Sequence, residues 1–159
     1  MTAEPRRRTR ASTLVPGATP QLPEVPLPVP RILLVDDDPL WLTRLRESID
    51  GVAGVVVATT TSGQHALDLV ELVHPQVALI DLDMPTPGIG GALTAYLMRR
   101  RDPSVRIVIL AEDIRDATDL RGIGAVARVA KTAPAATLHE AIGQATALPP
   151  AHHHRTPSR

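Results

Sequence analysis

The sequence predicts an α/β fold in which a parallel sheet is covered by helices on both faces. Five short apolar runs alternate with segments whose apolar residues recur at helical spacing. Such alternation is typical of parallel strands joined by helical crossovers. Each run has four or five residues and is bounded by turn-forming residues, which indicates buried strands. Because crossovers between parallel strands are right-handed, we expect a doubly wound strand order.

The predicted elements follow one another from residue 31 onwards. The expected strands are residues 31–35, 55–59, 77–80, 106–110 and 126–130. The expected helices are residues 39–50, a segment between Ser62 and His74, and residues 92–101, 114–121 and 135–147. Asp38 and Pro39 are a typical helix start, because aspartate caps free backbone amides and proline suits the first helical position.

Composition narrows the classes of function. The chain has 159 residues, zero formal net charge, no cysteine, one tryptophan, one tyrosine and no phenylalanine. Disulfide and thiol chemistry are therefore excluded, and the scarcity of aromatic residues argues against stacking on nucleic-acid bases. No apolar run approaches the roughly 20 residues of a membrane helix. No apolar signal segment follows the arginines at residues 6–8, so we expect a cytoplasmic protein without membrane contact.

We expect one domain with two flanking segments. Residues 31–147 hold all the expected strands and helices. Seven of the sixteen prolines and an arginine cluster fall in residues 1–30, which predicts a disordered leader. Residues 148–159 are expected to form a disordered tail. Because the chain ends soon after the last expected helix, we expect no DNA-binding domain in it.

Charged side chains at three strand ends predict one site. Asp36 and Asp37 follow the first strand, Asp81 the third and Lys131 the fifth. We expect the flavodoxin-like order 2-1-3-4-5, in which ligands bind at the carboxyl ends of strands one and three. Mg²⁺ relieves the repulsion between crowded carboxylates by accepting their oxygens as ligands. Lys131 is the only lysine beside sixteen arginines, and its compact ammonium can neutralise a phosphoryl group on Asp81.

Three segments resemble the signature motifs of response-regulator receiver domains, which act in two-component phosphorelay signalling. They are ILLVDDDP at residues 32–39, LIDLDMP at 79–85 and GAVARVAK at 124–131. The resemblance covers about residues 31–147. It implies a phosphoprotein that is not an enzyme. It also implies a sensor histidine kinase or phosphotransfer protein as phosphodonor, and an unknown downstream protein as the partner that reads the signal.

The resemblance also implies a role for each site residue. Asp36 and Asp37 would bind Mg²⁺ as the acidic pair. Asp81 would be both the phosphoacceptor and a metal ligand, and the backbone carbonyl of Asp83 would complete the protein ligands. Lys131 would sense the phosphoryl group.

Two positions depart from the family pattern. Ala111 follows the fourth strand, where the family usually has Thr or Ser. Arg128 stands three residues before Lys131, where the family usually has Tyr or Phe. In the family the hydroxyl hydrogen-bonds the phosphoryl group, and the aromatic side chain swings inward on activation. Both residues of this switch are altered here, so we expect atypical signalling. A phosphorylation-independent interaction module, or pseudo-receiver, is the main alternative.

An enzyme is a second alternative. Asp81 and Asp83 resemble the Asp-x-Asp motif of haloacid-dehalogenase-type phosphohydrolases, with Asp81 as nucleophile and Asp83 as general acid. That family usually has Thr or Val where Pro85 stands, and it usually places the motif on the first strand rather than the third.

Overall fold

The computed structural model describes residues 29–85, 88–113, 115 and 119–149. Its sheet has five strands in the order β2-β1-β3-β4-β5, and all neighbours are parallel. The strands are β1 Arg31–Val35, β2 Val55–Thr60, β3 Val77–Asp81, β4 Arg106–Ala111 and β5 Ala125–Ala130. The predicted doubly wound α/β fold and the flavodoxin-like strand order are thus confirmed. The leader and the tail lie almost entirely outside the described residues.

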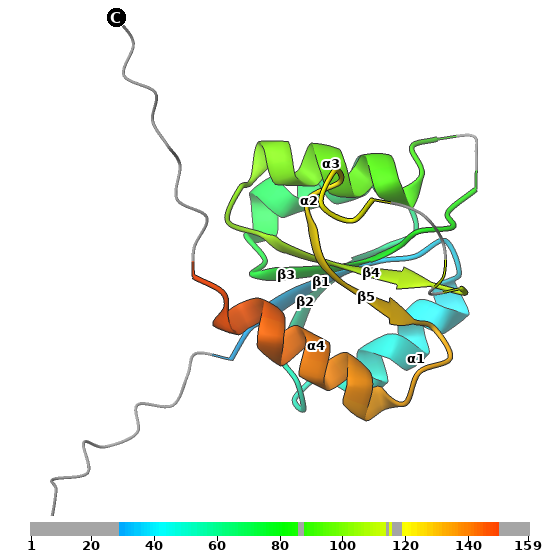
Figure 1. The fold of residues 1–159 in the computed structure, drawn as a ribbon, viewed down its shortest axis with the longest axis vertical. Coiled ribbons are helices and arrows are strands. Elements are labelled where there is room, and N and C mark those ends of the chain that lie inside the picture. Colours follow the sequence, from blue (N-terminus) through cyan, green and yellow to red (C-terminus); the bar gives the residue numbers. More distant parts are fainter. Residues whose placement is uncertain (1–28, 86–87, 114, 116–118, 150–159) are drawn as a thin grey trace, which may run out of the picture.

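Helices cover both faces of this sheet (Figure 1). They are α1 Pro39–Ile49, α2 Gly63–Val73, α3 Gly91–Arg101 and α4 Ala135–Ala147. Helices α2 and α3 lie on one face, and α1 and α4 lie on the other. The expected helix at residues 114–121 falls largely outside the described residues. Where that segment is described, at residues 115 and 119–121, it contains no helix.

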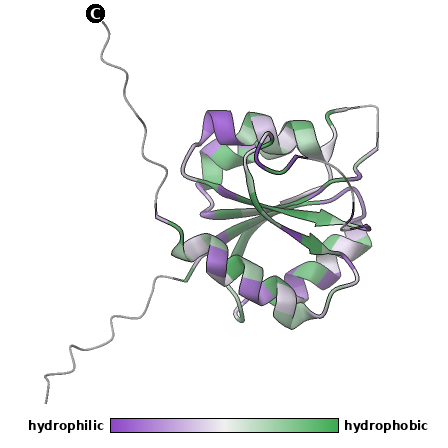
Figure 2. Ribbon diagram, viewed as in Figure 1, coloured by the Kyte–Doolittle hydropathy of each residue, from purple (hydrophilic) through white to green (hydrophobic). Residues whose placement is uncertain are grey.

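Apart from one charged residue at an end of each, the central strands β1, β3 and β4 are apolar because both of their faces are covered. Successive residues of β1 alternate between two cores: Leu33 and Val35 pack under α2 and α3, whereas Ile32 and Leu34 pack under α1 and α4. Figure 2 shows the apolar sheet between helices whose outer faces are more hydrophilic. The acidic residues Asp36 and Asp81 therefore lie where the buried strands β1 and β3 reach the edge of the sheet, and both are themselves buried.

Local signals set most of the boundaries. Asp38 caps α1 as predicted, because its Oδ1 accepts hydrogen bonds from the amides of Leu40 at 2.8 Å and Trp41 at 3.1 Å. Three strands end one residue later than predicted, and the extensions of β3 and β4 concern the site. Asp81 is the last residue of β3 because it pairs with Leu110, and Ala111 is the last residue of β4 because it pairs with Ala130.

Two glycines allow α3 to pack closely. A Cβ atom at Gly91, the first residue of α3, would overlap the carbonyl oxygen of Asp81. A Cβ atom at Gly63, the first residue of α2, would overlap the hydroxyl of Thr94. Only glycine leaves room for these contacts, so Gly91 helps to fix the backbone of Asp81.

Candidate functional site

Three aspartates meet at the carboxyl ends of β1 and β3. Asp36 and Asp81 are almost completely buried, and Asp37 is exposed. Each offers a carboxylate oxygen, and these oxygens lie within 4.8 Å of one another. Two oxygens bound to one Mg²⁺ at about 2.1 Å can be no more than about 4.2 Å apart. Small side-chain rotations would therefore bring this donor set onto one hard cation.

Lys131 joins the two buried aspartates. Its Nζ lies 2.8 Å from Asp36 Oδ2 and 3.0 Å from Asp81 Oδ2. The amide of Lys131 donates to the carbonyl of Ala111 at 2.9 Å, which continues the pairing of β4 and β5 by one residue. This hydrogen bond anchors the backbone of the lysine beside the end of β4. One ammonium thus pairs with two buried carboxylates that lie at the ends of different strands.

The remaining oxygens of the two buried aspartates are held by backbone amides. Asp36 Oδ1 accepts a hydrogen bond from the amide of Asp38 at 2.9 Å. Asp81 Oδ1 accepts one from the amide of Asp83 at 3.2 Å. In both cases the donor lies two residues further along the chain. Each carboxylate therefore has one oxygen directed at its own loop and the other directed at Lys131.

Burial makes Asp81 a weaker acid than a free aspartate. Desolvation raises the pKa of Asp81 from 3.8 to about 6, and the nearby charge of Asp36 adds to this effect. Hydrogen bonds from Lys131 and the Asp83 amide oppose the increase without cancelling it. For Lys131, burial alone would lower the pKa, but its contacts with Asp36 and Asp81 outweigh burial and raise it. Lys131 is therefore a permanently charged group at neutral pH.

The other acids near the site have different surroundings. The carboxylate of Asp38 is engaged in capping α1, as expected from the sequence. Asp83 is exposed, and its Oδ2 accepts a hydrogen bond from the amide of Glu112 at 3.4 Å. This contact links the loop after β3 to the end of β4.

The two atypical positions lie on β4 and β5. Ala111 is buried, and Arg128 is partly buried and pairs with Ile109. Because side chains alternate along a strand, Arg128 projects from the same face of the sheet as Ile109 and Ala111. This face is the one that α2 and α3 cover.

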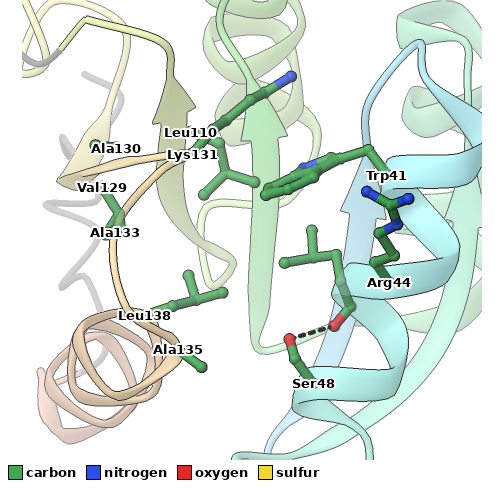
Figure 3. Close-up of a pocket in the computed structure, with 11 residues that line it drawn as sticks. Trp41, Arg44, Ser48, Leu110, Val129, Ala130, Lys131, Ala133, Ala135 and Leu138 are labelled. Atoms are coloured by element: carbon green, nitrogen blue, oxygen red, sulfur yellow. Dashed lines mark hydrogen bonds between the residues drawn. The ribbon is translucent and has the colours of Figure 1, made fainter.

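Sequence reasoning missed one residue of the site. Trp41 lies in the expected helix of residues 39–50 and outside all three motifs, but its ring centroid lies 5.8 Å from Lys131 Nζ. Figure 3 shows the ring extending from α1 toward Leu110 and Lys131. The ring forms one wall of a pocket of about 200 Å³ between α1, the end of β5 and the start of α4. The signal available in the sequence was the position of Trp41 within the first turn of the helix that follows Asp36 and Asp37.

Comparison with known proteins gives the family. The response regulator receiver domain model matches residues 32–143, a range that contains Asp36, Asp37, Asp81 and Lys131. This chain belongs to the response-regulator receiver domain family. The flavodoxin-like sheet with acids at the ends of β1 and β3 is thus the receiver fold, and the resemblance inferred from the three motifs is confirmed.

The chain is similar to parts of longer curated proteins. It is 34% identical over 113 residues to the transcriptional activator protein ExaE of Pseudomonas putida. This match covers 67% of this chain and 51% of that protein. It is 33% identical over 117 residues to the response regulator GacA of Pseudomonas viridiflava, covering 70% of this chain and 53% of that protein. The chain thus spans about half the length of these curated relatives.

Solved structures share the receiver fold. A LuxR-family two-component response regulator from Aurantimonas sp. SI85-9A1 superimposes with a TM-score of 0.68 at 31% identity, covering 75% of this chain and 86% of that chain. The receiver domain of the putative response regulator NarL from Mycobacterium tuberculosis gives a TM-score of 0.67 at 24% identity, covering 75% of this chain and 97% of that one.

Among the described residues, no helix has the length and apolar character needed to cross a membrane.

Proposed function

We propose that this receiver accepts a phosphoryl group on Asp81 in a two-component phosphorelay. The donor would be a sensor histidine kinase or a phosphotransfer protein, and the signal would pass to a downstream protein by direct contact. The proposal includes action in the cytoplasm and a signalling role rather than an enzymatic one. One observation carries it: Lys131 Nζ contacts both Asp36 and Asp81 at the edge of a cluster of three carboxylates.

The donor set suits Mg²⁺. Carboxylate oxygens are the ligands that this hard cation prefers, and one ammonium leaves part of the charge of three aspartates uncompensated. We propose that Asp36, Asp37, Asp81 and the backbone carbonyl of Asp83 hold the ion. Bound there, it would supply electrostatic stabilisation to the oxygens of the transferring phosphoryl group.

The chemistry of the chain itself is a nucleophilic attack. A carboxylate oxygen of Asp81 forms a bond to phosphorus while the bond between phosphorus and the donor nitrogen or oxygen breaks, and the electron pair leaves with the donor. The amide of Asp83 orients the carboxylate. Lys131, already 3.0 Å from Asp81 Oδ2, would follow the negative charge onto the phosphoryl oxygens. Because the pKa of Asp81 is about 6, the nucleophile is mostly ionised at neutral pH.

The readout of this receiver is proposed to be atypical. Ala111 has no hydroxyl to donate to a phosphoryl oxygen, and Arg128 replaces the aromatic side chain of the usual switch. These two positions support the alternative of a pseudo-receiver that binds its partner without phosphorylation. Both functions use the same fold, so a chemical test must separate them.

The test is intact-mass spectrometry of the protein after incubation with acetyl phosphate and Mg²⁺. We expect one added phosphoryl group on the wild type and none on Asp81→Asn. Asp83→Asn is the matched control, because it removes an exposed carboxylate two residues away and should still accept the group. Excess chelator should abolish the adduct.

Other outcomes identify the alternatives. If the wild type binds Mg²⁺ by calorimetry but gains no phosphoryl group, and beryllofluoride also fails to bind, the pseudo-receiver replaces the proposal. Catalytic release of phosphate from small phosphate esters, lost in both Asp81→Asn and Asp83→Asn, would instead support the phosphohydrolase.

A further inference from the structure

We propose that Trp41 is a positioning residue whose ring holds the ammonium of Lys131 against the phosphoacceptor. The inference rests on the proposed function, because it concerns how Lys131 serves Asp81. It also extends that function, since neither the family motifs nor the acidic cluster includes Trp41. The observation behind it is the 5.8 Å distance from Lys131 Nζ to the centroid of the indole ring, which is within the range of a cation–π contact.

The ring is fixed in place by its own helix. The amide of Trp41 donates to Asp38 Oδ1 at 3.1 Å within the N-cap of α1. The side chain is partly buried and packs against the core beneath α1 and α4. The cap and the core therefore define where the indole stands before any ligand arrives.

The indole nitrogen does not explain this placement. Trp41 Nε1 is buried and has no hydrogen-bond partner among the described residues. An unpaired buried donor destabilises a fold, so a ring without this N–H group would suit the position better on grounds of hydrogen bonding. The contact that the indole does make with a charged group is through its face, toward Lys131.

Lys131 needs such a restraint because other positions are open to it. Trp41 and Lys131 together line two cavities, the apolar pocket of about 200 Å³ and a second cavity of about 180 Å³. The second cavity is also lined by Asp38 and Glu112, whose carboxylates could attract an ammonium. A lysine has a flexible four-carbon stem. The bulk and the electron-rich face of the ring favour the position between Asp36 and Asp81.

The decisive experiment observes the lysine directly. Because Lys131 is the only lysine in the chain, labelling with lysine that carries ¹³C at Cε gives a single resonance in a heteronuclear NMR spectrum. In the wild type we expect this signal to be displaced by the ring current of Trp41. Loss of the ring current by itself moves the signal in Trp41→Leu and Trp41→Met, so the measure of restraint is the order parameter of the lysine Cε. It should stay near the wild-type value in Trp41→Phe and fall toward that of a solvated lysine in Trp41→Leu and Trp41→Met.

Kinetics provide the second measurement. At saturating Mg²⁺ and acetyl phosphate, Trp41→Leu should slow the phosphorylation of Asp81 by about fivefold to tenfold, as expected for loss of one cation–π contact. Trp41→Phe should stay within about twofold of the wild type. The dissociation constant for Mg²⁺, measured by calorimetry without phosphodonor, should change by less than about threefold, because the ring of Trp41 faces Lys131, which is not a proposed metal ligand.

Leu138→Ala is the matched structural control. Leu138 lies on α4, is buried in the same core and lines the same pocket as Trp41 (Figure 3). Its truncation should lower thermal stability and leave both the lysine resonance and the phosphorylation rate unchanged. A general packing effect of Trp41→Leu would instead be reproduced by Leu138→Ala.

Each result has a defined meaning. An unchanged Cε order parameter in both Trp41→Leu and Trp41→Met would overturn the inference. Equal slowing in Trp41→Phe and Trp41→Leu would also overturn it, because the N–H group rather than the ring face would then matter. A wild type that takes up no phosphoryl group would refute the proposed function alone, since the Cε order parameter still reports whether Trp41 restrains Lys131.

Discussion

Lys131 bridges Asp36 and Asp81, with its Nζ at 2.8 Å from one carboxylate and 3.0 Å from the other. Asp81 ends β3, Asp36 directly follows the neighbouring strand β1, and the lysine follows the edge strand β5. One side chain therefore connects the carboxyl ends of three strands. The arrangement couples the charge state of the site to the stability of the fold.

Replacement of Lys131 should destabilise the protein. Lys131→Met keeps most of the side-chain volume but leaves two buried carboxylates without their counter-ion. Loss of one partner of a buried ion pair costs about 3 kcal/mol or more of unfolding free energy. We expect this loss in urea denaturation at pH 7.5 and a smaller one at pH 5, where Asp81 is protonated. Arg44→Met, which removes an exposed cation from α1, should have little effect. Equal losses in the two variants would contradict the role of the ion pair.

Asp81 should make the stability of the metal-free protein depend on pH. The pKa of Asp81 is about 6 in the folded protein and 3.8 is its ordinary value. The folded state therefore binds more protons than the unfolded state between these two values. Unfolding free energy should fall as pH rises from about 4 to 6, by about 3 kcal/mol in total, and stay level above.

Asp81→Asn removes this contribution. In chelator, the variant should be more stable than the wild type at pH 8, and the difference should shrink as the pH is lowered to 5. Urea denaturation at the two pH values measures it. Addition of Mg²⁺ should reduce the difference in unfolding free energy between the two proteins at pH 8, because the ion stabilises the wild type with Asp81 ionised. A difference that is independent of pH would show that Asp81 does not titrate in this range.

Asp38 and its neighbour Asp37 should behave differently despite their adjacency. Asp38→Ala removes the N-cap of α1 and should cost about 1 kcal/mol of unfolding free energy, with the dissociation constant for Mg²⁺ within about twofold of the wild type. Asp37→Ala removes an exposed acid of the cluster. Asp37→Ala should leave the unfolding free energy unchanged and weaken the affinity for Mg²⁺ at least about tenfold. Calorimetric titration would contradict this division if both variants lost affinity equally.

Gly91 should be intolerant of any side chain. In Gly91→Ala, the new Cβ would overlap the carbonyl oxygen of Asp81, so either α3 or the end of β3 must move. We expect a loss of about 2 kcal/mol or more in unfolding free energy, as for other overpacked sites, together with weaker Mg²⁺ binding.

Gly143 is the matched control for this substitution. It lies within α4, and a Cβ there would meet no atom within 4 Å. Gly143→Ala should stabilise the protein by about 0.5 to 1 kcal/mol, because alanine favours the helix interior. Thermal or urea denaturation of the two variants checks both expectations. Equal effects would show that the close contact at Gly91 is unimportant.

The sequence by itself determined the fold class, the strand order and the family. Apolar runs between turn residues identify buried strands, because burial on both faces demands continuous apolar residues. The start of α1 at Asp38 and Pro39 was equally local, since capping involves only amides two and three residues away. The sequence also predicted that Asp36, Asp37, Asp81 and Lys131 would meet, because the ends of parallel strands share one edge of the sheet.

Only the tertiary structure decided how those residues interact. The raised pKa of Asp81 depends on how far the whole edge excludes water, which no local pattern encodes. Lys131 pairs with Asp36 as well as Asp81 and lies beside the ring of Trp41, and these are contacts between segments far apart in the chain. Gly91 lies against the carbonyl of Asp81 across the loop between β3 and α3. Their distances follow from the packing of α1 and α3 on the sheet, and packing is a property of all the side chains together.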